Sequence, residues 1–117
     1  MEARNRTVVR SPRSKRTDVE LGEDLQRLGL AVGRIVAVME HAGARAPSYL
    51  LTLDLGAQGR HDCTIPRGEH EQTELEGTQV LCARQGDEVS LVAVHSHAHG
   101  VVLLCPEREV EDGSTVA

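Results

Sequence analysis

The sequence predicts one small all-β domain with an aliphatic core, and three observations support this. The chain has 117 residues, which is the size of a single domain and leaves no room for a second. Short runs in which apolar and polar residues alternate recur along it, bounded by glycine or proline, as in β-strands. The chain contains one tyrosine and no phenylalanine or tryptophan. Leucine, valine, isoleucine and alanine must therefore form the core.

About five strands are expected. The longest covers residues 30–40, and Gly33 within it is expected to mark a bulge or bend. The clearest alternation runs from Ser48 to Leu55, between a proline and a glycine. The remaining strand patterns are "GRHDCTI" (59–65), which ends before Pro66, "TQVLCA" (78–83), and a hairpin of "EVSLVAV" (88–94) with "VVLLC" (101–105) across "HSHAHG" (95–100).

Two helical segments accompany the strands. "TDVE" at 17–20 has the spacing of a capping box. Leu21, Leu25 and Leu28 then recur at helical spacing before Gly29, so we predict an N-terminal helix over 18–28. Residues 69–76 suit a helical turn closed by a glycine. A small helix between the third and fourth of five strands is the order of an OB-fold barrel. The fold class expected is therefore all-β with short helices: a five-stranded OB-fold barrel with an N-terminal helix.

Charge divides the chain into two parts. Residues 1–16 hold six basic residues and one acid, whereas the rest holds seven arginines and 17 acids, so that the whole chain has a net charge of -5. We therefore expect a basic disordered arm over residues 1–17 and an OB-fold domain over 18–117. Such an arm could contact phosphates or acidic surfaces. It could equally be a solvated tail that balances an acidic body.

The cysteines and the apolar runs indicate the cellular compartment of the protein. Cys63, Cys82 and Cys105 are odd in number, far apart and form no CxxC pair, which is typical of thiols in a reducing compartment. No apolar run approaches the roughly 18 residues that a membrane span needs. We expect a cytoplasmic protein that does not enter a membrane.

Three segments resemble the tRNA-binding-domain family: "LGLAVGRIV" (28–36), "ARAPSYLLTLDLG" (44–56) and "VVLLCPEREVEDGSTVA" (101–117). The residues that carry the resemblance are Pro47, Ser48, Tyr49, Asp54, Leu55, Gly56, Pro106, Arg108, Val110 and Gly113. The chain is most similar to the small stand-alone CsaA-type proteins, which are OB-fold homodimers described as tRNA-binding and as export-related chaperones. The resemblance implies a non-catalytic homodimer that binds tRNA or other structured RNA and uses no cofactor. It also implies unfolded or exported polypeptides as a second kind of partner.

The chain also departs from this family. Ala46 and Leu50 flank the Pro-Ser-Tyr motif where the family usually presents a lysine, and "CARQG" (82–86) replaces a longer loop. These positions lie where an OB barrel meets nucleic acid. The function expected is non-catalytic RNA binding, with tRNA as the ligand that the resemblance implies. The alternative is a chaperone-like or protein-binding dimer that has lost RNA affinity.

The candidate RNA-binding residues are polar or aromatic and lie at or near strand ends. They are Arg45, Ser48, Tyr49, Arg60, Arg67 and Arg84. The four arginines could cluster and grip phosphates, or could simply pair with surface carboxylates. The single ring could form a structural corner at the strand entry or a stacking platform for bases, and we favour the corner.

Neither the histidine-rich turn nor the nucleophilic residues predict a metal site or a catalytic site. His95, His97 and His99 alternate at a turn, and on a flat strand they lie about 7 Å apart, too far for all three to share one metal. We expect a solvated turn and no metal site. No phosphate-binding loop or nucleophile with an orienting base is present, and Cys63 beside His61 lacks a third group. We therefore expect no catalytic activity.

Overall fold

The computed structural model describes residues 27–43 and 45–116. The basic arm over 1–17 and the helix predicted over 18–28 lie outside these residues, apart from the last two positions of the helix. The described part forms seven strands, one short α-helix and a single 3-10 turn. In chain order they are β2 (Leu30–Glu40), β3 (Ser48–Asp54), η2 (Gly56–Gln58), β4 (Arg60–Pro66), α2 (Gln72–Leu75), β5 (Gln79–Gln85), β6 (Glu88–Leu91), β7 (Ala93–Ser96) and β8 (Gly100–Leu103).

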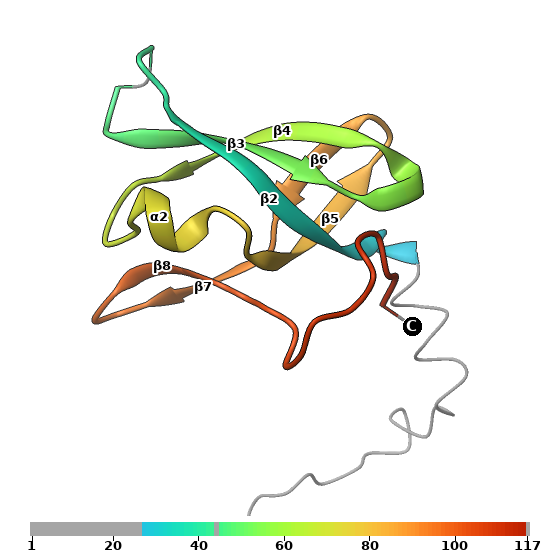
Figure 1. Ribbon diagram of the computed structural model, residues 1–117. Coiled ribbons are helices and arrows are strands. Elements are labelled where there is room, and N and C mark those ends of the chain that lie inside the picture. Colours follow the sequence, from blue (N-terminus) through green and yellow to red (C-terminus); the bar gives the residue numbers. More distant parts are fainter. Residues whose placement is uncertain (1–26, 44, 117) are drawn as a thin grey trace, which may run out of the picture.

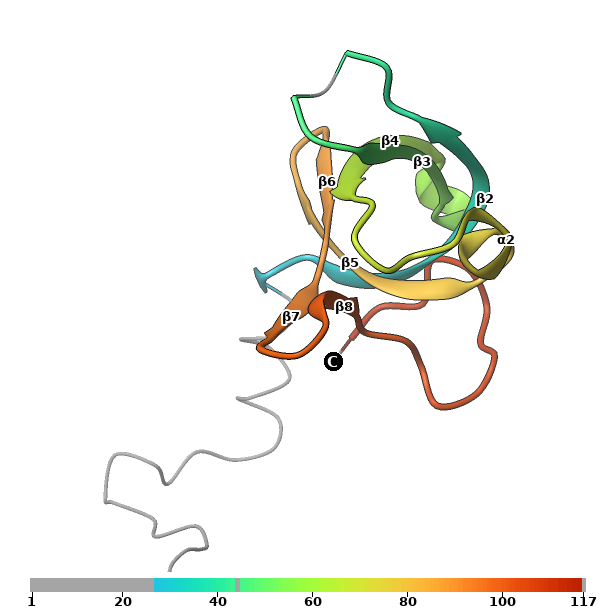
Figure 2. The same cartoon turned by 90° about the vertical axis from the view of Figure 1, so that its left-hand side faces the viewer.

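Five of the strands form a nearly closed barrel. They are hydrogen-bonded in the order β4-β3-β2-β5-β6, and every neighbouring pair is antiparallel. The two edge strands, β4 and β6, approach each other and bring the sheet round almost into a ring (Figure 2). The short helix α2 lies between β4 and β5 in the chain and beside the barrel (Figure 1). This order confirms the predicted OB-fold barrel.

The core lies inside the barrel and is aliphatic apart from one ring. The predicted alternation of the second strand is confirmed, because Tyr49, Leu51 and Leu53 are buried while the residues between them are partly exposed. The largest fully buried side chains are those of Ile35, Leu51, Leu53, Leu55, Val80 and Cys82. Each buried leucine or isoleucine contributes roughly 1.5–3 kcal/mol relative to an exposed one.

The long first strand has a register shift, but two residues beyond the position that the sequence suggested. Its first half pairs with β5 and its second half with β3, and the register shifts between Ile35 and Ala37. The prediction of a bulge at Gly33 is therefore wrong. This glycine serves close packing instead: a Cβ built on it would meet the Sγ atom of Cys82 at 3.1 Å and Leu55 at 3.4 Å.

The predicted strand 88–94 is two strands in two different sheets. β6 pairs with β5 and completes the barrel, whereas β7 pairs with β8 in a separate hairpin. The chain changes partner at Val92, whose N–H donates to the carbonyl oxygen of Leu81 at 2.9 Å. A period-two pattern indicates which side chains point inward but not which neighbour a strand pairs with, so the pattern could not reveal this break.

The C-terminal segment, residues 104–116, loops away from the barrel after β8, and its last residues, 113–116, lie along the first half of β2 (Figure 1). The N–H of Val32 donates to Ser114 O at 2.8 Å, and that of Gly113 donates to Val32 O at 2.6 Å. The C-terminal segment also comes very close to the turn η2, at Gly56 and Gly113: a Cβ on Gly56 would lie 2.2 Å from Asp112 O. Both glycines have positive φ, 63° and 92°, so this crossing depends on glycine at both positions.

Side chains fasten the same segment to the barrel. Arg34 donates from Nε to Asp112 Oδ1 at 3.2 Å and also pairs with Glu109. The buried amide of Gln79 donates to Val110 O at 2.6 Å and to Asp112 Oδ1 at 2.8 Å. The carboxylate of Asp112 therefore accepts hydrogen bonds from both Arg34 and Gln79.

Candidate functional site

The outer face of β3 and β4 is the surface on which OB barrels bind their partners. Four register pairs present this face: Ser48 with Pro66, Leu50 with Thr64, Thr52 with Asp62, and Asp54 with Arg60. It carries two carboxylates and one guanidinium, and the guanidinium lies 3.9 Å from Asp54 Oδ2. The face therefore has neither the positive charge nor the rings by which OB barrels hold single-stranded nucleic acid.

Tyr49 is part of the core. Its side chain is only 6% exposed and packs in the cluster that holds Leu51 and Ile65. The hydroxyl donates to His70 O at 3.3 Å. In this position the ring is a packing element at the entry to β3, and no face of it is open for a base to stack on.

The four candidate arginines do not come together in one cluster. Arg45 and Arg67 lie at one end of β3 and β4, where the N–H of Arg67 donates to Pro47 O at 2.9 Å. Arg60 lies opposite Asp54 at the other end of the same two strands. Arg84, at the end of β5, is hydrogen-bonded to the turn that precedes Arg60. Because β3 has seven residues, roughly 20 Å separate its two ends.

The remaining candidate, Ser48, is half-buried at the start of β3. Its Oγ donates to Ala46 O at 3.1 Å. This bond closes the end of the loop that carries Arg45. The hydroxyl thus has a local structural role in shaping the loop.

An apolar pair lies on the same outer face as the acidic residues. Met39 is 58% exposed on β2, and Leu50 is its register partner on β3. Asp62 lies on the neighbouring strand and accepts a hydrogen bond from Thr52 Oγ1 at 3.1 Å. We refer to Met39 and Leu50 as the Met39–Leu50 pair.

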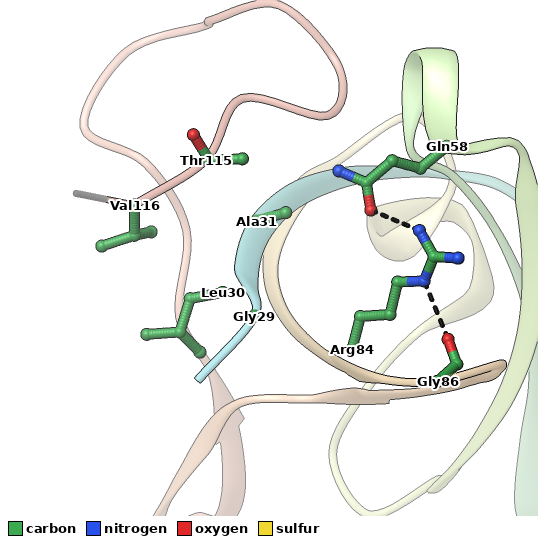
Figure 3. A pocket seen from close by; sticks show the side chains of 8 residues that line it. All are labelled: Gly29, Leu30, Ala31, Gln58, Arg84, Gly86, Thr115 and Val116. Carbon is green, nitrogen blue, oxygen red and sulfur yellow. Dashed lines mark hydrogen bonds between the residues drawn. The ribbon is translucent and has the colours of Figure 1, made fainter. Parts of the chain in front are cut away.

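Arg84 lines a cavity at the end of the barrel where β2 begins (Figure 3). The cavity has a volume of about 510 Å³. The Nη1 of Arg84 donates to Gln58 Oε1 at 2.9 Å, and the Nε of Arg84 donates to Gly86 O at 3.0 Å. Leu30, Ala31 and Val116 supply the apolar part of the wall. We call this the arginine pocket.

Sequence reasoning selected Arg84 but missed the pocket around it. The walls come from the start of β2, the turn at η2, the end of β5 and the C-terminal segment. Only the closure of the barrel brings these four segments together. No local pattern could have signalled their meeting.

The histidines near the β7–β8 hairpin make ordinary hydrogen bonds. His99 Nδ1 lies 3.1 Å from Glu69 Oε1, and His70 Nε2 lies 3.0 Å from Val101 O. His95 lies within β7, opposite Val101, rather than in the turn. Across residues 27–43 and 45–116, no group of three or more histidine, cysteine or acidic side chains could hold a metal ion.

The two inner cysteines are poor nucleophiles. Burial raises the pKa of Cys63 from 9.0 to about 12 and that of Cys82 from 9.0 to about 11. His61, two residues before Cys63, is bonded through Nε2 to Gln58 O at 3.0 Å. At neutral pH both thiols are therefore protonated.

In the part of the chain that the structure describes, no helix is long and apolar enough to cross a membrane.

The strand order and the position of the helix define an OB-fold barrel protein. Among solved structures, the chain is similar to the chaperone CsaA from Bacillus anthracis str. Ames, with 25% sequence identity and a TM-score of 0.69 over 81% of this chain and 96% of that one. It is also similar to the CsaA chaperone protein from Picrophilus torridus, with 22% identity, a TM-score of 0.69 and the same coverage. No protein-family model and no curated protein matches the chain. The structural resemblance to CsaA that the sequence predicted is thus confirmed.

Proposed function

We propose that this protein is a non-catalytic, CsaA-like chaperone that binds segments of other polypeptides carrying both basic and apolar residues. The observation that carries the proposal is the outer face of the barrel, which holds both the Met39–Leu50 pair and the carboxylates of Asp54 and Asp62. The similarity to solved CsaA chaperones supports the same function.

The chemistry of this face suits an extended polypeptide better than a nucleic acid. Methionine is unbranched and polarizable, so an exposed Met39 can pack against many different apolar side chains. Asp54 and Asp62 would attract lysine or arginine in the bound segment. The same carboxylates would repel phosphates.

A peptide-binding experiment tests the proposal. A fluorescent peptide that alternates leucine and lysine is titrated with the full chain, and its anisotropy is measured against a matched leucine–glutamate peptide. We expect the basic peptide to bind about tenfold more tightly. Met39→Ser should weaken its binding by about tenfold, because the face loses its apolar anchor. Val94→Ser removes an apolar side chain of 47% exposure outside this face and is the matched control. Equal binding of both peptides, or an unchanged affinity in Met39→Ser, would refute the proposal.

RNA binding is a second candidate, supported by Arg45 and Arg67 at the loop end of the barrel. Both are exposed, and the residues that the structure describes include no carboxylate within ion-pair distance of either. The basic arm would add six cations. We propose that any affinity for tRNA depends on these cations and not on base stacking.

Salt-dependent binding separates this candidate from the first. Deleting residues 1–16 should weaken tRNA binding and reduce the slope of log K against log salt by several units, because each neutralised phosphate releases counterions. Arg45→Ala and Arg67→Ala should weaken it further without unfolding the barrel, whereas Arg108→Ala removes an exposed charge elsewhere and is the control. If the truncated chain binds tRNA as tightly as the full chain, while a folded Tyr49→Ala variant does not bind, stacking accounts for the affinity.

A further inference from the structure

The guanidinium of Arg84 is held in place without being neutralised. Its two hydrogen-bond acceptors, Gln58 Oε1 and Gly86 O, carry no formal charge. Arg34 differs, because it pairs with the carboxylates of Glu109 and Asp112. Within the described ranges, Arg84 has no acidic partner. A positive charge is therefore fixed in position at the wall of the cavity.

The bonds that fix Arg84 leave donors available. A guanidinium has five N–H groups, and two of them are taken by Gln58 and Gly86. Both N–H groups of Nη2 and the second N–H of Nη1 have no acceptor among residues 27–43 and 45–116. These donors form the fork that matches the two oxygens of a carboxylate. Because two bonds already orient the side chain, little further entropy is lost when a ligand binds.

The rest of the arginine pocket is largely apolar. Leu30, Ala31 and Val116 add aliphatic side chains to the lining of the cavity that Arg84 also lines (Figure 3). The volume of about 510 Å³ lies within the range of small-molecule sites. An apolar cavity with one fixed polar group is the usual arrangement for a ligand that has one charged end.

We propose that the arginine pocket binds a ligand in which a carboxylate adjoins an aliphatic group. The carboxylate accepts hydrogen bonds from Nη1 and Nη2 of Arg84, and the aliphatic group packs against Leu30 and Val116. A singly charged group is favoured over a phosphate, because one guanidinium faces the ligand and the chain has a net charge of -5. Such a carboxylate belongs either to a small organic acid or to the last residue of a polypeptide. This site is separate from the Met39–Leu50 pair and does not depend on the function proposed for that surface.

NMR titration of the full-length protein tests the site, with 4-methylpentanoate as the probe and its neutral amide as the matched control. The acid should shift the resonances of the Arg84 Nε–H and of the backbone N–H groups of Ala31 and Gly86. The control compound, 4-methylpentanamide, should bind at least about tenfold more weakly than the acid. Arg84→Gln should lower the affinity for the acid by about tenfold or more. Arg60→Gln removes an arginine on the outer face and should change it less than about twofold.

Two tripeptide arms identify the source of the carboxylate. Gly-Gly-Leu is compared with the same tripeptide amidated at its C-terminus. If the free tripeptide binds more tightly than 4-methylpentanoate, the site takes polypeptide ends, and if it binds more weakly, the site takes small acids. In both cases Met39→Ser should leave the affinity unchanged, which separates this site from the proposed chaperone surface.

Three results would overturn the proposal. The acid and the amide could bind equally, folded Arg84→Gln could retain the affinity, or the acid could shift resonances at exposed arginines such as Arg67 instead of those of the pocket. If Arg84→Gln does not fold, the pattern of shifts in the unaltered protein still decides the outcome.

Discussion

Tyr49 and His70 are joined by a hydrogen bond of 3.3 Å from the phenol hydroxyl to the backbone carbonyl oxygen. The imidazole of His70 is itself bonded to Val101 O in the β7–β8 hairpin. Tyr49, the only Phe, Tyr or Trp residue of the chain, thus connects the entry of β3 to the segment that holds this hairpin. It fills the core and reaches a polar partner at the same time.

Replacing this tyrosine should separate its two contributions. Tyr49→Ala should lower the free energy of unfolding by about 3–5 kcal/mol, as for other large aromatic residues removed from a core. Tyr49→Phe keeps the ring and loses only the hydroxyl bond, so it should cost about 0.5–1.5 kcal/mol. Urea denaturation monitored by circular dichroism measures both. A loss below about 1 kcal/mol in Tyr49→Ala would show that the ring is not a core element.

Asp112 should control the attachment of the C-terminal segment. Asp112→Ala leaves the Nε of Arg34 without an acceptor and removes one of the two acceptors of the Gln79 amide, and should cost about 1–3 kcal/mol. Hydrogen exchange should accelerate at Gly113 and Val116, whose amides bond to β2. Glu107→Ala removes a carboxylate whose side chain is 86% exposed and is the matched control. Equal exchange in the two variants would contradict this role of Asp112.

The buried Cys82 and the half-buried Cys63 should make the protein less stable at high pH. Burial raises the pKa of Cys82 to about 11 and that of Cys63 to about 12, from an ordinary 9.0. Between these values and the ordinary one, the unfolded chain releases thiol protons that the folded chain retains. The stability is therefore fully present below about pH 9 and falls as the pH rises towards 11 and 12.

Denaturation at a series of pH values checks this dependence. A variant with Cys63→Ser and Cys82→Ala should show a shallower loss of unfolding free energy above about pH 9, whatever its stability at pH 7. Maleimide should label the exposed Cys105 first in the folded protein. Labelling of Cys82 as rapid as that of Cys105 would show that the core thiol is accessible.

We expect the chain to form a homodimer in solution. Leu28 is 54% exposed at the start of the described residues, and it ends a leucine series with helical spacing in the sequence. Light scattering at micromolar concentration should give twice the chain mass of 12.7 kDa. Leu28→Asp should shift the mass towards the monomer, whereas Met39→Ser should not. A monomer mass for the unaltered protein would remove this expectation.

The sequence allowed the barrel to be predicted in most of its parts. The strand over 30–40 was placed correctly, since its apolar run is long and ends in polar residues. The strand from Ser48 was recognised because every second residue is apolar. Glycines after helices and strands marked the turns correctly, as at Gly77. These features depend on residues close together in the sequence, so the pattern of apolar residues and glycines predicts them.

The features that were missed depend on contacts between distant segments. The change of partner at Val92 depends on the backbone of Leu81. The separation of Arg45 and Arg67 from Arg60 depends on the direction in which β3 and β4 run. The arginine pocket requires four segments that meet only in the closed barrel. None of these relations changes the spacing of apolar residues in the sequence.

The C-terminal segment has a consequence for solubility. It covers the edge of β2 at Leu30 and Val32, where β3 no longer pairs with that strand. The bridge between Ala31 and Thr115 joins positions about 80 residues apart, so we expect this cover to form late in folding. Its release would expose an apolar strand edge that can pair with another molecule while most of the barrel stays folded. A weakened segment should thus lead to aggregation from a nearly native state, at denaturant concentrations too low to unfold the barrel.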